Sequence, residues 1–133
     1  MSGERDLARL LAGLRPRRAE GSYVYTSVEG GGVPAGVRPF ATVDESEGLT
    51  LVLPREDADA AGLPYDYVAA LITLEVHSDL AAVGLTAAVS TRLAEAGISS
   101  NVIAGARHDH LLVPDERADE AVRLLEEFGS RAH

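Results

Sequence analysis

The sequence LITLEVHSDLAAVGLTAAVSTRLAEAGISSNVIAGARHDHLLVP, residues 71–114, contains both of the hydrophobic periods that distinguish strands from helices. Residues 67–76 form the longest strand-like run, and apolar and polar residues alternate at its end, as in a strand with one covered face. Apolar residues recur every three or four positions between residues 81 and 96, which predicts a helix packed on one side. Gly97 supplies the expected end of that helix.

Two shorter apolar segments, residues 101–105 and 110–113, follow this helix and flank a polar turn. They indicate two strands joined by a hairpin turn. A last helix is expected over residues 115–128, where the apolar residues return to helical spacing. The second half of the chain is therefore predicted to contain a strand, a helix, two strands and a helix.

The first half contains shorter elements of the same kinds. We expect a helix, three strands and a second helix, in that order, at residues 7–14, 23–28, 38–43, 48–53 and 54–62. Pro16 prevents the first helix from continuing. The second and third strands are separated by an acidic turn and are predicted to form a hairpin.

An internal repeat connects the two halves. LVLPREDADAA, residues 51–61, aligns with LLVPDERADEA, residues 111–121, and in both copies a strand is followed by a proline and a helix. The recurrence of these elements in the same order indicates a duplication. We therefore expect an N-terminal unit at residues 1–66 and a C-terminal unit at residues 67–133, with the strand at residues 67–76 shared between them.

Composition excludes several classes of function. The chain has 133 residues and a formal net charge of -9, and no basic stripe is left to neutralise a phosphate backbone, so nucleic acid is not an expected partner. It has no cysteine, which excludes disulfides, thiolate metal sites and cysteine nucleophiles. No apolar run approaches the roughly 18 residues of a membrane span, and the charged start is unlike a secretion signal. We expect a cytoplasmic protein that does not contact membranes.

The segments EGLTLVLPRE, residues 47–56, and residues 71–114 closely resemble small tandem ACT-domain proteins of uncharacterised function. The resemblance covers nearly the whole chain. It implies an α/β protein of the α+β kind, with two ferredoxin-like βαββαβ units, mostly antiparallel sheets and helices packed on one face. The chain departs from this pattern because the second unit lacks its last strand and the first lacks a clear opening strand.

ACT units commonly pair through their sheets and bind amino acids or similar effectors. The resemblance implies that the effector meets the helix start at Val83-Gly84-Leu85, where unpaired backbone N–H groups can receive a carboxylate. Side-chain oxygens of Asn101 or Asp79 would then hold its ammonium group. The ligand-binding residues expected on this basis are Ser78, Asp79, Val83, Gly84, Leu85, Asn101 and Ile103. In the alternative interpretation, Gly84 is a turn residue and Asn101 caps a strand.

The polar turn His108-Asp109-His110 admits three interpretations. Residues two apart on a strand share a face, so both histidines could reach one metal ion, but two ligands do not make a zinc site. The turn could instead close a hairpin, with Asp109 bonded to backbone N–H groups. All three residues could also line the effector pocket. We expect no metal site and no cofactor.

No arrangement of residues predicts catalysis. His77-Ser78-Asp79 has the residue types of a hydrolytic triad, but neighbours on one strand end point to different sides and no nucleophile elbow is present. The acidic turn Asp44-Glu45-Ser46-Glu47 does not have the spacing of an EF-hand and indicates a solvated surface or a weak cation contact. Gly30–Gly32 is not followed by the lysine of a phosphate-binding loop.

We therefore predict a non-catalytic sensor of a small molecule, with an amino acid as the expected ligand. Open sheet edges favour a homodimer, and the sensor would regulate a partner protein. Two other functions remain open at this point. The chain could be an interaction module without a ligand, or a metal-dependent enzyme that uses His108 and His110.

Overall fold

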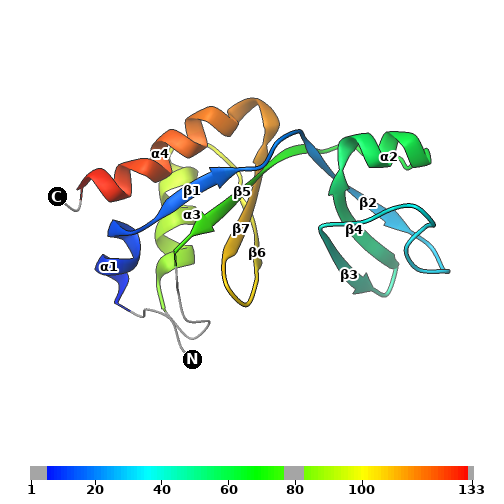
Figure 1. Cartoon of the computed structure of the whole chain (residues 1–133), viewed down its shortest axis with the longest axis horizontal. Helices are drawn as coiled ribbons and strands as arrows, with labels where there is room; N and C mark the ends of the chain where they lie inside the picture. The colour runs from blue at the N-terminus through cyan, green and yellow to red at the C-terminus, as the bar shows by residue number, and fades with distance from the viewer. Residues whose placement is uncertain (1–5, 77–82, 132–133) are drawn as a thin grey trace. The chain divides into compact units, whose positions relative to one another are not determined.

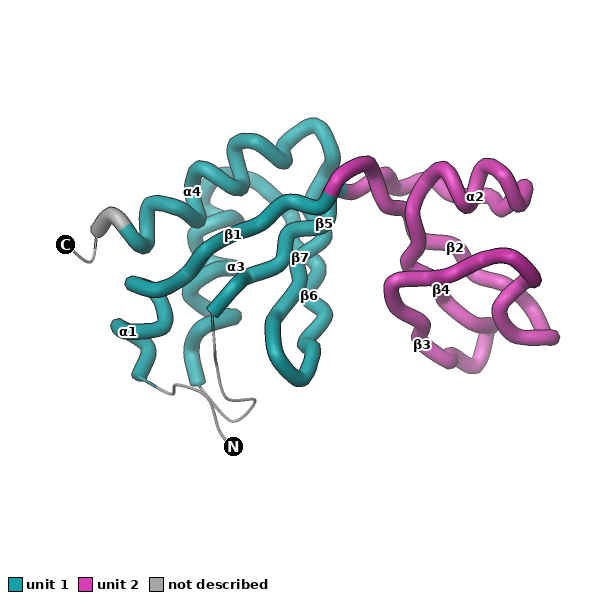
Figure 2. Tube along the Cα trace, viewed as in Figure 1, with its two compact units in different colours: residues 1–19, 70–133 teal, residues 20–69 magenta. Residues whose placement is uncertain are grey.

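The computed structural model describes residues 6–76 and 83–131, which form two compact units (Figures 1 and 2). Unit 1 comprises residues 1–19 and 70–133, and unit 2 comprises residues 20–69. The elements are, in chain order, α1 (Leu7–Ala12), β1 (Arg15–Arg18), β2 (Tyr23–Val28), β3 (Ala41–Glu45), β4 (Gly48–Pro54), α2 (Arg55–Ala61), β5 (Val68–Glu75), α3 (Leu85–Glu95), β6 (Asn101–Ala104), β7 (Asp109–Pro114), the 3-10 turn η1 (Asp115–Arg117) and α4 (Ala118–Arg131). The fold is mixed α/β with antiparallel strand pairs, as expected.

Unit 1 is a four-stranded sheet in the order β1-β5-β7-β6, with α1, α3 and α4 packed against it. Ile72 and Leu74 of β5 and Leu111 of β7 contribute to one core together with the apolar sides of the three helices. Because side chains alternate along a strand, Thr73 and His110 lie on the opposite face. We call this face of the unit 1 sheet, opposite the helices, the outer face.

The strand β1 was not expected, and it corrects the prediction that the second unit lacks its last strand. Arg15–Arg18 pairs antiparallel with β5, from Arg15 opposite Glu75 to Arg18 opposite Ile72. In a βαββαβ unit the fourth strand borders the first, and β1 occupies that position beside β5. The N-terminal part of the chain therefore completes the sheet of the C-terminal ACT unit.

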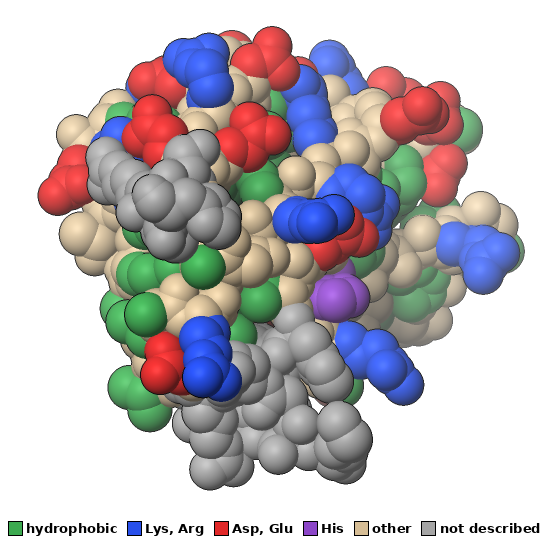
Figure 3. All heavy atoms as spheres, turned by 60° about the vertical axis from the view of Figure 1, so that its left-hand side comes forward, with side chains coloured by type: hydrophobic (Ala, Val, Ile, Leu, Met, Phe, Trp, Pro, Cys, Tyr) green, Lys and Arg blue, Asp and Glu red, His purple; other side chains and the backbone are tan. Residues whose placement is uncertain are grey.

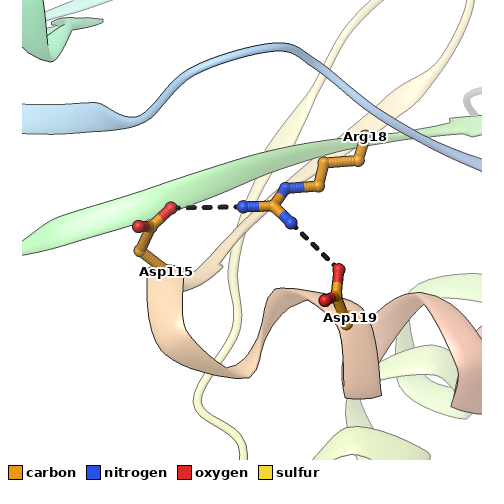
Figure 4. A network of polar contacts seen from close by, with 3 residues as sticks. All are labelled: Arg18, Asp115 and Asp119. Atoms are coloured by element: carbon orange, nitrogen blue, oxygen red, sulfur yellow. Dashed lines mark hydrogen bonds and ion pairs between the residues drawn. The ribbon is translucent and has the colours of Figure 1, made fainter.

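Ion pairs and apolar contacts hold this N-terminal part in unit 1 (Figure 4). Arg18 Nη1 donates to Asp119 Oδ1 at 3.0 Å and Arg18 Nη2 donates to Asp115 Oδ1 at 3.5 Å, which ties β1 to the start of α4. Leu10 of α1 and Leu14 are buried in the core of the same unit. The spatial grouping therefore differs from the expected division between residues 66 and 67, because residues 6–19 belong with the second half.

Unit 2 has four strands in the order β3-β4-β2-β5, to which β5 contributes Val68 and Ala69. Leu51 and Leu53 of β4 form a small core with Ala58 of α2. We expected this half to lack an opening strand, but β2 occupies that position. All residues of unit 2 are described, and the unit has no helix between β2 and β3. Residues 29–40 connect these strands without regular secondary structure.

Several predicted boundaries shift for identifiable reasons. The predicted hairpin of the first half is present, but β3 begins after Pro39, which has no N–H to donate to a strand partner. The helix expected over residues 81–96 begins at Leu85, after Gly84 in a left-handed conformation. Pro54 and Pro114 each end a strand directly before a helical segment, so the repeated sequence forms the same structure in both units.

Candidate ligand-binding site

The start of α3 differs from the starts of the other helices. Gly84 is its N-cap residue, its first turn contains no acidic residue, and no described side chain caps it. Each of the other helices begins beside a carboxylate, from Asp6 before α1, Glu56 and Asp57 in α2, and Asp119 and Glu120 in α4. Backbone N–H groups in the first turn of α3 are thus left to receive an anion.

Gly84 itself is held tightly by the fold. Its φ of 102° lies in a region that favours glycine, and a Cβ atom there would lie 3.1 Å from Leu7 Cδ2. The side of Gly84 that faces α1 is therefore filled by Leu7, and only the side along the helix axis is left for a ligand. Leu85 is buried in the core, whereas Val83 is 83% exposed, so of these two only Val83 is available at the surface.

A shallow hollow of about 450 Å³ extends from Gly84 along the exposed side of α3. Its lining is mostly apolar, and Arg92 and Glu95 stand at its far end. Arg92 donates to Glu127 of α4 at 3.0 Å, which fixes one wall. The helix start thus opens onto a surface that could accept an apolar group beside a carboxylate.

Asn101 does not lie beside Gly84 within unit 1. β6 begins after the other end of α3, as Figure 1 shows, and the helix has 11 residues. At 1.5 Å per residue its ends are about 16 Å apart, much more than the separation of the carboxylate and ammonium groups of one amino acid. The two halves of the expected site are therefore not brought together in one unit.

Asn101 and Ile103 belong instead to the outer face, because Asn101 lies opposite Leu112 and Ile103 opposite His110 in the β6–β7 register. Thr73 Oγ1 lies 2.9 Å from His110 Nδ1 and joins β5 to β7 on this face. We missed Thr73 as a site residue. The alternation of Thr73 and Glu75 with apolar residues along β5 was the signal that placed them on the face opposite the core.

The segment between β6 and β7 is a tight turn, in which the Gly105 N–H donates to the His108 carbonyl oxygen at 2.9 Å. The Nδ1 atom of His108 is buried and has no hydrogen-bond partner among the described residues. Burial lowers the pKa of His110, the nearby His108 and Arg17 lower it further, and Asp109 acts in the opposite direction. Figure 3 shows a face of the molecule on which a histidine side chain lies beside basic and acidic side chains.

The remaining candidates divide into two groups. His77, Ser78 and Asp79 lie outside the described residues. In unit 2, Asp44 and Glu47 line a hollow of about 550 Å³ with Gly30–Gly32. Within residues 6–76 and 83–131, no three histidine or acidic side chains are arranged to hold a metal ion.

Comparison with known families agrees with this geometry. Residues 2–70 match one ACT-domain family and residues 68–127 match a second ACT-domain family. The chain belongs to the ACT-domain proteins and carries two such domains in tandem. ACT domains are regulatory and non-catalytic, they typically bind small-molecule effectors, and they often dimerise.

Solved structures share the fold. A protein of unknown function from Vibrio cholerae, VC0802, described as a possible transport protein, is 49% identical with a TM-score of 0.85 over 92% of this chain and 95% of that one. Protein Atu0741 from Agrobacterium tumefaciens is 20% identical with a TM-score of 0.65, and covers 87% of this chain and 89% of its own. The ligand-free regulatory subunit of aspartate kinase from Thermus thermophilus is 9% identical with a TM-score of 0.65. The match covers 88% of this chain and 97% of that one.

None of the curated proteins compared with the chain matches it significantly. Over the described residues, no helix has the length and apolar character needed to cross a membrane.

Proposed function

We propose that the protein is a non-catalytic sensor whose C-terminal ACT unit binds an amino acid through its α-carboxylate at the start of α3. The observation that carries this proposal is the contrast among helix starts, since α3 alone among the described helices begins without a neighbouring carboxylate. A ligand carboxylate would accept hydrogen bonds from N–H groups of the first turn and interact favourably with the helix dipole. The hollow beside Gly84 would accommodate the apolar part of its side chain.

The ammonium group of the ligand requires acceptors from elsewhere, because Asn101 of the same unit lies at the far end of α3. Asn101 is exposed on the edge strand β6, where a second copy of the chain could pair. We therefore propose a homodimer in which Asn101 and Ile103 of one copy approach Val83 and Gly84 of the other. Ser78 and Asp79 remain proposed contacts of the ligand.

A matched pair of substitutions on α3 tests the proposal. Thr86→Asp places a carboxylate in the first turn, where it would occupy the N–H groups that the ligand needs, and Ser90→Asp makes a similar change farther along the helix, at a position that does not line the hollow. A panel of the twenty amino acids is screened by thermal shift, followed by calorimetry on the amino acid with the largest effect. At 100 times its Kd, a ligand stabilises the folded protein by about 2.7 kcal/mol.

The native chain and the Ser90→Asp variant should show the same ligand-induced rise in Tm, and the Thr86→Asp variant should show none. Asn101→Ala should weaken binding without unfolding unit 1, since Asn101 is exposed. Sedimentation analysis of the native chain then tests the homodimer. A flat response of the native chain to every amino acid, or an unchanged response of the Thr86→Asp variant, would contradict the proposed site.

A further inference from the structure

A row of side chains crosses the outer face of unit 1, and its central contact, between Thr73 and His110, is not among the contacts proposed for the effector. Arg17 of β1 lies opposite Thr73 of β5, and Ile103 of β6 lies opposite His110 of β7. The contact of 2.9 Å between Thr73 Oγ1 and His110 Nδ1 joins the two pairs into one row. His110 is therefore the residue through which the β6–β7 hairpin makes a side-chain hydrogen bond to β5.

The partly buried imidazole of His110 has a neighbour at each of two edges. Its Nδ1 edge faces the Thr73 hydroxyl, and its other edge faces the hairpin turn, where a Cβ atom on Gly105 would lie 3.3 Å from His110 Nε2. The same Cβ atom would lie 2.9 Å from the His108 carbonyl oxygen. Only a glycine permits so close an approach of the turn to the ring.

The charged groups around His110 disfavour a second positive charge. Arg17 approaches from β1, and its Nε donates to Glu75 Oε2 of β5 at 2.8 Å. His108 and Asp109 precede His110 in its own hairpin, and only Asp109 favours the imidazolium. Burial, which contributes most, and the two neighbouring basic groups together lower the pKa of His110 from its ordinary value of 6.5.

We propose that the imidazole of His110 is a clamp that helps the backbone pairing hold the β6–β7 hairpin on β5, and that its protonation shifts the equilibrium towards the open hairpin. In the closed hairpin the ring resists a proton, whereas in the open hairpin it is exposed to water and takes one at its ordinary pKa. Stability of the closed form is therefore complete above pH 6.5 and is lost as the pH falls below that value towards the lowered pKa. Within that window the opening constant rises by up to about tenfold per pH unit.

The affected strand, β6, is one of the two edge strands of the unit 1 sheet. In the described part of unit 1, β6 pairs only with β7, so a hairpin that opens on β5 also changes the edge that β6 presents. The clamp would make that edge sensitive to mild acid. This inference goes beyond the proposed sensor function and does not depend on any ligand.

Hydrogen exchange of the backbone amides tests the clamp. Protection factors, which are corrected for the intrinsic pH dependence of exchange, are measured at pH 7.5 and pH 5.5 for residues 101–104 and 109–112. We expect a severalfold loss of protection in the native chain at the lower pH, confined to the hairpin. His110→Gln cannot be protonated but can still bond to Thr73, so its protection should not change with pH.

Two arginine substitutions provide the control. Arg17→Gln removes a cation that acts on His110, so the His110 pKa, followed by its ring resonances in NMR, should rise towards 6.5 and the acid sensitivity should shrink. Arg107→Gln makes the same change at an exposed position of the same turn and should leave both measurements unaltered. The clamp is overturned if hairpin protection in the native chain is independent of pH, or if Arg17→Gln and Arg107→Gln have equal effects. The NMR titration of His110 in the native chain and the two arginine variants tests the proposal even if His110→Gln fails to fold.

Discussion

Units 1 and 2 arrange their strands in the same order but complete the ACT pattern in different ways. Unit 1 has both helices of a βαββαβ unit and takes its fourth strand, β1, from the start of the chain. Unit 2 has all four strands in place but replaces its first helix with residues 29–40. The strand order is therefore the same in a unit whose fourth strand comes from a distant part of the chain and in a unit that lacks its first helix.

The difference has a consequence for binding. The proposed carboxylate position lies at the start of the first helix of an ACT unit, and that helix exists in unit 1 as α3 but not in unit 2. Residues 29–40 instead lead to an acidic hollow, which does not favour a carboxylate. Of the two ACT units, only unit 1 has the helix start needed for the proposed site, and we expect one ligand per chain.

The largest expected effect comes from the two cores. Leu10→Ala in unit 1 and Leu51→Ala in unit 2 each remove a side chain that is 0% exposed, and each should lower the free energy of unfolding by roughly 2–5 kcal/mol. Hydrogen exchange should show that Leu10→Ala reduces protection of α4 and β7, whereas Leu51→Ala reduces protection of β2. An equal loss in both units for either variant would show that they unfold together and that the division into units has no energetic meaning.

A smaller effect is expected at Gly84 and Gly62, two glycines that lie next to helices and have positive φ. Gly84→Ala meets both an unfavourable φ of 102° and Leu7 Cδ2 at 3.1 Å, and should lower the free energy of unfolding by about 2–3 kcal/mol. Gly62→Ala, after α2, has a φ of 68° and no atom within 4 Å, and should lower it by only about 1 kcal/mol. Urea denaturation measures both. Equal losses would mean that the contact with Leu7 is relieved at no cost.

The spacing of hydrophobic residues along the sequence predicted the elements that bury one of their faces, such as α3 and the hairpin of β3 and β4. It could not predict β1, because Arg15–Arg18 has no apolar alternation and becomes a strand only through pairing with β5. The pairing depends on residues far apart in the sequence, as in the ion pairs of Arg18 with Asp115 and Asp119. A local pattern contains no information about such partners.

The candidate site shows the same limit. The resemblance to ACT proteins indicated Gly84 and Asn101 as separate ligand contacts. The length of α3 shows that these two residues of one unit are too far apart to contact the same small ligand. The contact between Thr73 and His110 depends on how β5 and β7 are aligned, which neither segment specifies by itself. The close approach of Gly105 to the His110 ring could not be predicted from the sequence for the same reason.

The smallest expected effect concerns the ion pairs that join β1 to α4. Arg18 is 37% exposed, Asp115 32% and Asp119 92%, so solvent screens the attraction and Arg18→Gln should cost only about 0.5 kcal/mol. Arg38→Gln, at an exposed position in unit 2, is the matched control and should have no measurable effect. Urea denaturation gives the stability, and exchange of the Ala19 N–H, which donates to the Leu71 carbonyl oxygen at 2.9 Å, reports on the end of β1. A loss above about 2 kcal/mol would exceed the usual value of an exposed ion pair. It would mean that charge, rather than the backbone ladder and the buried Leu10, keeps the borrowed strand in unit 1.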